Sequence, residues 1–204
     1  MIETLKQYDA LFIQNNSHGD EKCESVFEFC NRSSQLILSA PHSTRSFVSK
    51  KEKIADLYVG AIVKFIGIEK NISTLIRTKY TPYKALISDY IANNNLQKHY
   101  FLDIHGFNQD IGYDICLGIG EASADNYPKI KDIINIAQKY NLKIIVNHPN
   151  YTGINGLTGR YHKIFKNPNV IQIEIKKYLR DFYANPDVVE NITLPFLRDV
   201  VDCY

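Results

Sequence analysis

The stretch HYFLDIH (99–105) decides the fold, because it predicts an apolar strand that runs directly into a histidine. Five other segments predict strands as well: QLILSA (35–40), ISTLIR (72–77), YDICLGI (113–119), LKIIVN (142–147) and VIQIEI (170–175). Segments with helical spacing of apolar residues lie among them: 50–67, 82–94, 127–141 and a last one near 193–203. The alternation predicts an α/β domain with a largely parallel or mixed sheet.

Local patterns predict where some of these elements begin and pair. The helix over 50–67 is predicted from one apolar face, made by Ile54, Leu57, Ala61, Ile62 and Phe65. The helix over 127–141 begins at Tyr127-Pro128, because proline is favoured in the first helical turn. Two early segments, ALFIQ (10–14) and SVFEFC (25–30), predict strands that form a hairpin at a sheet edge.

Composition limits the classes of protein to which the chain can belong. Its 204 residues predict a single domain, 1–204, and 45% hydrophobic with 23% charged residues exclude a disordered chain or a coiled coil. The 24 Lys and Arg against 22 Asp and Glu are too evenly balanced for an electrostatic grip on nucleic acid or an anionic membrane. The N-terminal segment lacks signal-peptide features, and no apolar run reaches the roughly 20 residues that span a bilayer, so we expect a cytoplasmic protein.

Three of the predicted strands carry residues for which an apolar strand has no structural use. His42 follows the strand QLILSA, His105 ends HYFLDIH, and Glu174 lies among the isoleucines of VIQIEI. In an open α/β sheet, ligands bind outside the carboxyl ends of the strands. We therefore expect the two histidines to lie close together at that edge.

Two neutral imidazoles and one carboxylate are enough to hold a catalytic zinc ion with a fourth position open to water. The third ligand is left open between Asp56, on the predicted helix over 50–67, and Glu52, one turn earlier. Asp103 points to the same side of its strand as His105, where it would hold the second ring nitrogen of that histidine. An ionised carboxylate in a buried strand is costly unless it is paired or working, so Glu174 is predicted to be the catalytic base.

Arginines supply candidates for substrate binding. A guanidinium fork matches the two oxygens of a carboxylate, and Arg45, Arg77 and Arg160 are the candidates. Each residue on its own also fits a structural role, as a hydrogen-bonded histidine, a helix-surface acid, a buried ion pair or a surface salt bridge. The residues taken singly leave both interpretations open.

Five motifs occur in a fixed order along the chain: LSAPHS (38–43), KIADLYVGAIV (53–63), LDIHG (102–106), NHPNYTGINGLTGRYHK (147–163) and IQIEIKKYLRD (171–181). In this order the chain resembles the N-formylglutamate amidohydrolase family, relatives of the zinc carboxypeptidases, over 35–183. The resemblance implies a three-layer α/β/α fold of the zinc-carboxypeptidase type, with a mixed, mostly parallel sheet. It also implies His42, Asp56 and His105 as ligands of Zn²⁺, Glu174 as the catalytic carboxylate and Arg160 as a binder of the substrate carboxylate.

The sequence departs from the related patterns at three places. Arg45 stands three residues after His42, where the carboxypeptidases have a glutamate. Gly159 separates Thr158 from Arg160, which are adjacent in the better-known amidohydrolases, and Lys176-Lys177 stands where an arginine often follows the glutamate. The first departure leaves the carboxylate ligand open, and the others indicate a substrate that can differ from N-formylglutamate.

Together these features predict a zinc-dependent hydrolase that cleaves the amide bond of an N-acyl amino acid, so that its partner is a small-molecule carboxylate. A metallocarboxypeptidase acting on a small peptide or cell-wall fragment is the alternative within the same chemistry. A metal-free carboxylate-binding module of the same fold is the alternative from another class. Nucleotide binding is not predicted, because no glycine-rich phosphate loop follows a strand.

Overall fold

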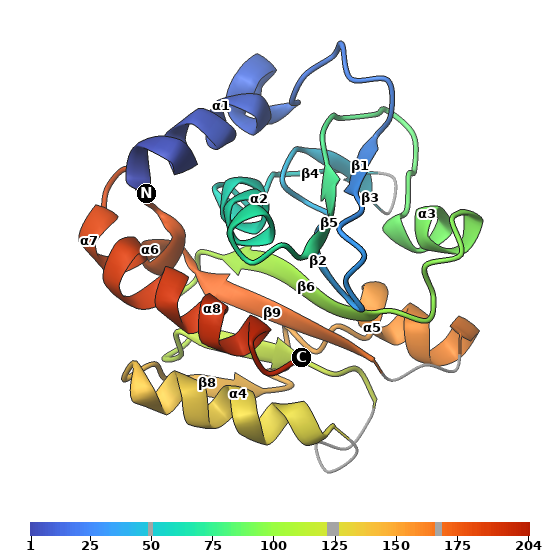
Figure 1. The fold of residues 1–204 in the computed structure, drawn as a ribbon. Helices are drawn as coiled ribbons and strands as arrows, with labels where there is room; N and C mark the ends of the chain where they lie inside the picture. The colour runs from blue at the N-terminus through green and yellow to red at the C-terminus, as the bar shows by residue number, and fades with distance from the viewer. Residues whose placement is uncertain (49–50, 122–126, 166–168) are drawn as a thin grey trace.

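The computed structural model describes residues 1–48, 51–121, 127–165 and 169–204. A seven-stranded sheet in the order β1-β5-β2-β6-β9-β7-β8 runs through its centre (Figure 1). Its strands are β1 (Phe27–Cys30), β2 (Leu36–Ala40), β5 (Ser73–Arg77), β6 (Tyr100–Phe107), β7 (Ile115–Gly118), β8 (Ile144–Val146) and β9 (Val170–Lys176). Two short strands, β3 (Ser46–Val48) and β4 (Lys51–Lys53), pair separately as an antiparallel ribbon.

The pairing within the sheet confirms the predicted mixed and mostly parallel arrangement. The pairs β2–β5, β2–β6, β6–β9 and β7–β8 are parallel, whereas β1–β5 and β7–β9 are antiparallel. The three strands from which the site was predicted, β2, β6 and β9, are adjacent and parallel. Their carboxyl ends therefore lie at one edge of the sheet.

Helices cover both faces of the sheet. One face packs against α1 (Ile2–Ser17), α2 (Val59–Glu69), α4 (Pro128–Lys139) and α8 (Leu194–Val201). The opposite face packs against α3 (Ile87–Asn93) and α5 (Leu157–Arg160). Short helical segments fill the connections: η2 (Tyr161–Phe165), α6 (Lys177–Arg180), α7 (Pro186–Val188) and η3 (Val189–Thr193). This is the three-layer α/β/α architecture that the sequence predicts.

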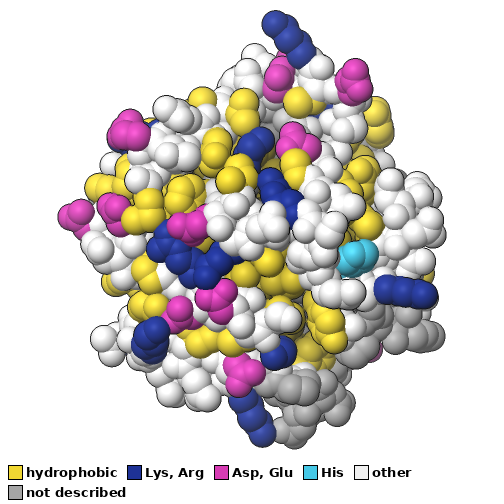
Figure 2. All heavy atoms as spheres, viewed as in Figure 1, with side chains coloured by type: hydrophobic (Ala, Val, Ile, Leu, Met, Phe, Trp, Pro, Cys, Tyr) yellow, Lys and Arg dark blue, Asp and Glu magenta, His cyan; other side chains and the backbone are white. Residues whose placement is uncertain are grey.

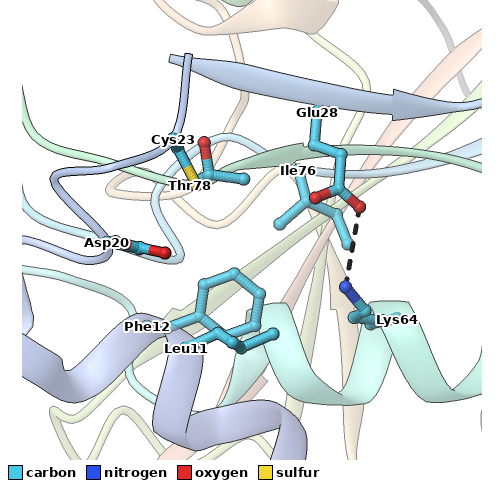
Figure 3. Close-up of a pocket in the computed structure, with 8 residues that line it drawn as sticks. All are labelled: Leu11, Phe12, Asp20, Cys23, Glu28, Lys64, Ile76 and Thr78. Carbon is cyan, nitrogen blue, oxygen red and sulfur yellow. Dashed lines mark ion pairs between the residues drawn. The ribbon is translucent and has the colours of Figure 1, made fainter. Parts of the chain in front are cut away.

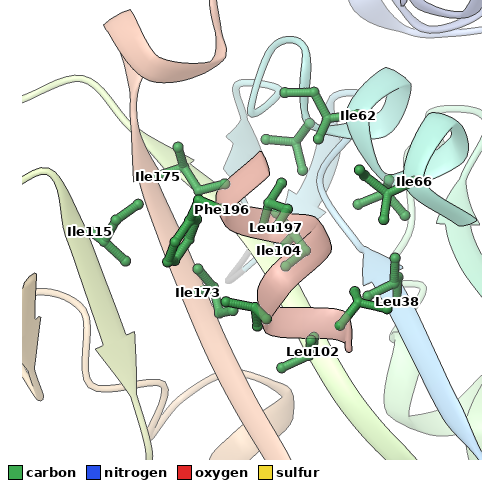
Figure 4. Close-up of a cluster of buried hydrophobic side chains, with 14 of the residues drawn as sticks. Leu38, Ile62, Ile66, Leu102, Ile104, Ile115, Ile173, Ile175, Phe196 and Leu197 are labelled. Carbon is green, nitrogen blue, oxygen red and sulfur yellow. The ribbon is translucent and has the colours of Figure 1, made fainter. Parts of the chain in front are cut away.

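Strand alternation divides the side chains of the central strands between the two layers. Leu102 and Ile104 of β6 point into the larger core, where the fully buried Phe196 and the neighbouring Leu197 of α8 pack among them (Figure 4). The residues that alternate with them, Asp103 and His105, point to the other face. The candidate site therefore lies on the side of α3 and α5, with the larger apolar core behind it.

Several predicted elements are wrong in type or extent. ALFIQ (10–14) lies within α1 and is not a strand. The strand predicted within SVFEFC is confirmed as β1, but it pairs with β5 and forms no hairpin with residues 10–14. A short apolar run does not distinguish strand from helix, and here the buried residues Leu5, Asp9 and Phe12 recur with helical spacing.

The helix predicted over 50–67 begins only at Val59. Tyr58 precedes it in the left-handed conformation (φ 74°), and Lys51–Lys53 pair as strand β4. Lys50 lies outside the described residues. Asp56 is therefore in the connection before α2 and not on a helix, which corrects the predicted placement. The helices predicted over 82–94 and 127–141 are shorter, at Ile87–Asn93 and Pro128–Lys139.

Asp9 on α1 is a buried carboxyl whose two oxygens have no hydrogen-bond partner among the described residues. Burial, with the charge of Asp181, outweighs a contribution from Tyr183 and raises the pKa of Asp9 from 3.8 to about 6. The folded chain thus holds this proton more tightly than the unfolded chain. Proton binding by Asp9 therefore stabilises the folded chain at low pH, and this stabilisation is lost as the pH rises from about 4 through about 6.

Replacement of Asp9 by asparagine removes this pH dependence. We expect Asp9→Asn to raise the free energy of unfolding at pH 8 by up to about 3 kcal/mol relative to the wild type, because about two pKa units are removed. The difference should shrink as the pH approaches 4. Urea denaturation of both proteins at pH 4.5, 6 and 8 measures it, and a difference that does not vary with pH would contradict the argument.

The face of the molecule seen in Figure 2 shows basic and acidic side chains interspersed, in keeping with the net charge of +2. Within the described ranges, no helix has both the length and the apolar character required to cross a bilayer.

Candidate functional site

His105 is the centre of a buried hydrogen-bond network at the carboxyl end of β6. Its Nε2 lies 2.9 Å from Oδ2 of Asp103, two residues earlier on the same strand face, and its Nδ1 lies 3.2 Å from Oδ2 of Asp56. The other oxygen of Asp103 accepts a hydrogen bond from Ser39 on β2 at 2.6 Å. Burial opposes charging of His105, but Asp103 and Asp56 outweigh it and raise the pKa to about 10. Without a metal, the ring is thus held between two carboxylates.

His42 lies beside this network. It follows the end of β2, its ring centroid is 5.2 Å from that of His105, and its Nδ1 is 3.0 Å from the hydroxyl of Ser46. Burial, together with the charges of Lys53 and His105, holds the pKa of His42 well below its usual range. Its imidazole is therefore neutral, which is the form that binds a metal.

Two separations within this group are compatible with a tetrahedral zinc ion. Two ligand atoms at about 2.0–2.1 Å from the same zinc are about 3.3 Å apart, and the centroids of two bound imidazoles are about 5.2 Å apart. The separation of 3.2 Å between His105 Nδ1 and Asp56 Oδ2 agrees with the first value, and the separation of 5.2 Å between the His42 and His105 rings agrees with the second. Asp103 holds the remaining nitrogen of His105, as carboxylates commonly do behind a metal-bound histidine.

The complete set does not yet surround a common point. Among the residues whose placement is described, no group of three or more His, Cys, Asp or Glu side chains has the arrangement of a metal site. The pairs fit zinc, and the chemistry of the donor set, two imidazoles and a carboxylate, fits it as well. Asp56 is held ionised: burial acts against this, but the hydrogen bond with His105 and the charge of Lys53 keep its pKa well below the usual range.

Glu174 faces the same side of the sheet from the neighbouring strand. In the parallel pairing of β6 and β9, Glu174 lies opposite His105 and Gln172 opposite Asp103. Gln172 donates a hydrogen bond from Nε2 to Oε1 of Glu174 at 2.9 Å. Glu174 is 7% exposed, and burial raises its pKa despite the opposing charge of His105. A buried carboxylate with a raised pKa beside this pair of histidines is suited to accept a proton.

A cavity of about 470 Å³ opens beside the histidines. Its wall includes His42, Asp103 and His105, whereas Asp56 and Glu174 do not line it. Basic and apolar side chains also line it. The basic ones are Arg77, Lys84 and Arg160, and the apolar ones are Phe27, Pro41, Phe47, Val48, Ala85, Leu86, Ile87 and Leu157. Its volume falls in the range of about 300–1,000 Å³ that is usual for small-molecule sites.

The three candidate arginines occupy different places. Arg160 lines the cavity and donates a hydrogen bond from Nη1 to Ser88 at 3.1 Å. Arg77 lines it too, but its Nε and Nη2 donate to the carbonyls of Pro41 and Ala85 at 2.9 and 2.6 Å. Arg77 therefore braces the residue before His42 and adds positive charge to the wall.

Arg45 is not among the lining residues of the cavity. Its Nε donates to the carbonyl of Asn16 at 2.8 Å, and its Nη1 pairs with Glu52. Glu52 in turn lies on the exposed ribbon β3–β4 and has a second partner in His18 at 3.9 Å. The structure thus brings Asp56, and not Glu52, to His105.

A second pocket, of about 280 Å³, lies on the other side of the sheet near α1 and α2 (Figure 3). It is lined by Leu11, Phe12, Asp20, Cys23, Glu28, Lys64, Ile76 and Thr78. Glu28 and Lys64 form an ion pair of 3.5 Å in this pocket. Its lining contains no histidine, so the larger cavity is the candidate functional site.

Comparison with known proteins supports the fold. No protein-family profile matches the sequence, and a comparison with curated proteins finds no match. Among solved structures, the chain is similar to N-formylglutamate amidohydrolase from Ralstonia eutropha JMP134, with a TM-score of 0.55 at 13% identity over 85% of this chain and 96% of that chain. The chain shares its fold.

Two further solved structures agree. A bacteriophage poly-gamma-glutamate hydrolase has a TM-score of 0.51 at 15% identity, over 88% of this chain and 87% of that chain. A gene product from Agrobacterium tumefaciens has a TM-score of 0.53 at 12% identity, over 88% and 96%. At such identities the comparisons establish the architecture alone, and they agree with the predicted three-layer α/β/α fold with its mixed sheet.

Several residues that complete the network are not among those predicted from the sequence. Ser39, Ser46 and Gln172 hold Asp103, His42 and Glu174, respectively. A signal existed for Ser39 and Gln172, because each is a polar residue in an otherwise apolar strand. The glycine between Thr158 and Arg160 is explained by sterics, because a Cβ at Gly159 would lie 1.9 Å from the carbonyl oxygen of Ile154.

Proposed function

We propose that the protein is a zinc-dependent hydrolase that cleaves the C–N amide bond of an N-acyl amino acid such as N-formylglutamate. The observation that carries the proposal is that His42 and Asp56 both lie beside His105, each at a separation from it that is compatible with zinc, with Glu174 on the next strand. The solved structures that share the fold include an N-formylglutamate amidohydrolase and a poly-gamma-glutamate hydrolase. Both names describe hydrolases of glutamate derivatives, which supports the same chemistry here.

Each residue has a distinct part in this proposal. His42, Asp56 and His105 would hold the zinc ion, and Asp103 would fix the ring of His105. When bound, zinc supplies Lewis acidity, which polarises an amide carbonyl and lowers the pKa of water. Glu174 accepts the proton of the attacking water and donates it to the leaving nitrogen, a transfer for which its raised pKa is suited.

The lining of the cavity supports a carboxylate-bearing substrate. Arg160 is placed to bind the substrate carboxylate, while Arg77 and Lys84 add positive charge around it. The apolar side chains of the lining reduce the contact of a bound substrate with water. Among the candidate substrates, N-acyl amino acids combine both features in a small molecule.

Metal content and hydrolysis of the purified protein test the proposal together. We expect near one zinc per chain, and release of amino acid from an N-acyl amino acid panel that includes N-formylglutamate. Prolonged chelation should remove the metal and the activity, and added Zn²⁺ should restore both. Short peptides assayed in parallel separate the amidohydrolase from a metallocarboxypeptidase.

Two outcomes would overturn the proposal. Absence of bound metal after zinc is offered to the folded protein would leave the fold as a carboxylate-binding module. Full activity after complete removal of zinc would show that hydrolysis does not depend on the metal.

A further inference from the structure

Arg180 is a buried cation immediately behind the candidate site. It lies at the end of α6, shortly after β9, and is only 2% exposed. Burying a guanidinium costs free energy unless its donors are satisfied and its charge is balanced. The partners that satisfy Arg180 therefore indicate what it does in the fold.

Its donors bind three segments that each carry a residue of the candidate site. Nε donates to the carbonyl of Ile175 at 3.1 Å, next to Glu174, and Nη1 donates to the carbonyl of Leu57, next to Asp56. Nη2 donates to the carbonyl of Phe107 at 3.3 Å, two residues after His105. It also donates to Oδ1 of Asn108 at 2.7 Å.

The glycine after His105 makes this arrangement possible. A Cβ at Gly106 would lie 2.4 Å from Nε and 2.5 Å from Cζ of Arg180, so the guanidinium lies directly against the bare backbone of β6. Bonded on three sides, this side chain cannot move aside as a flexible one would. Gly106 and Arg180 therefore form one steric unit.

The charge of Arg180 is balanced by the site itself. Its hydrogen-bond acceptors are neutral oxygens, and the strongest attractive charges that act on it are those of Asp56 and Glu174. A buried cation at this position offsets part of the repulsion among Asp56, Asp103 and Glu174.

We propose that Arg180 is a positioning residue that fixes the backbone beside Asp56, His105 and Glu174 in the geometry that binds metal. The inference rests on the proposed function for its metal, but the geometric part can be tested without metal. A planar guanidinium reaches three segments at once, whereas the single ammonium of lysine does not reproduce that fork.

Amide hydrogen exchange of the metal-free protein tests the geometric part. The amide of Asp56, which donates to the carbonyl of His42 at 2.8 Å, should exchange at least about 10-fold faster in Arg180→Lys. Amides in the β1–β5 pair, at the distant edge of the sheet, should keep their rates. Equal acceleration in both regions would mean general destabilisation and would overturn the proposal, as would unchanged exchange at Asp56.

Zinc affinity, measured by competition with a chromophoric chelator, tests the link to metal. We expect Arg180→Lys and Gly106→Ala each to weaken zinc binding by about 10–100-fold at a temperature where both are folded, the range seen for residues behind metal ligands. Arg32→Lys is the matched control, since Arg32 also donates to a backbone carbonyl, that of Ile72 at 3.1 Å, but outside the site. Unchanged affinity in both site variants would overturn the proposal. A wild-type protein that binds no zinc would refute the proposed function, while the exchange experiment would still decide the role of Arg180.

Discussion

Glu174→Gln is expected to reduce kcat by about 10²–10⁴-fold while leaving the zinc content unchanged, because general acid–base catalysis contributes about that much. The substitution preserves the shape of the side chain, and the new amide oxygen can still accept the hydrogen bond that Gln172 donates. It removes only the proton acceptor. Because burial opposes the charge of Glu174, loss of that charge should not lower the thermal stability.

Steady-state kinetics and metal analysis of the same preparation separate the possible causes. Glu28→Gln is the matched control, since Glu28 is also a strand glutamate but lies on β1 in the second pocket. It should retain wild-type activity. A decrease in kcat of less than about 10-fold for Glu174→Gln would remove Glu174 from the reaction, since general bases contribute more than that.

The fold could be predicted from the sequence because its central strands carry a strong and redundant signal. QLILSA, HYFLDIH and VIQIEI are predominantly apolar runs separated by helical segments, and they form the adjacent parallel strands β2, β6 and β9. The failures occurred at the periphery of the sheet. ALFIQ satisfies both a strand and a helix pattern, and only packing of α1 on α2 selects the helix.

The start of α2 at Val59 could not be predicted, because it is set by the backbone conformation of Tyr58, for which the sequence carries no signal. Tyr58 adopts a positive φ although it is neither glycine nor asparagine, so the apolar spacing from Ile54 onward suggested an uninterrupted helix. The incorrect helix boundary also gives an incorrect position for Asp56, which the spacing predicts on that helix. It is instead held in the preceding connection by the hydrogen bond from its amide to the carbonyl of His42.

The candidate site could be predicted where a polar residue interrupted an apolar strand. His105, Asp103 and Glu174 lie on one face of two paired strands, as their alternation requires. Arg45 could not be excluded from the sequence, because its pairing with Glu52 depends on the ribbon β3–β4. Arg180 had no signal either, since a charged residue after a strand is ordinary, and only its three-sided contact with backbone carbonyls distinguishes it.

The identity of the carboxylate ligand leads to the second large expected effect. Asp56→Asn should abolish stoichiometric zinc binding, with an affinity loss above the about 100-fold that is typical of residues behind the ligands, because a carboxamide is a poor zinc ligand. His42→Ala and His105→Ala should lose the metal as well. Glu52→Gln should keep near one zinc per chain, since Glu52 pairs with Arg45 and His18 on the exposed ribbon.

Asp56→Asn and Glu52→Gln are matched, because each changes one carboxylate to its amide within the same segment. Metal analysis after gel filtration compares them directly, with circular dichroism to verify that each variant is folded. If Glu52→Gln lost zinc and Asp56→Asn kept it, the ribbon β3–β4 would have to turn toward His105 on metal binding and break the Arg45–Glu52 pair. The 3.2 Å contact between Asp56 and His105 argues for the opposite result, because Asp56 already lies beside that histidine whereas Glu52 pairs with Arg45 and His18.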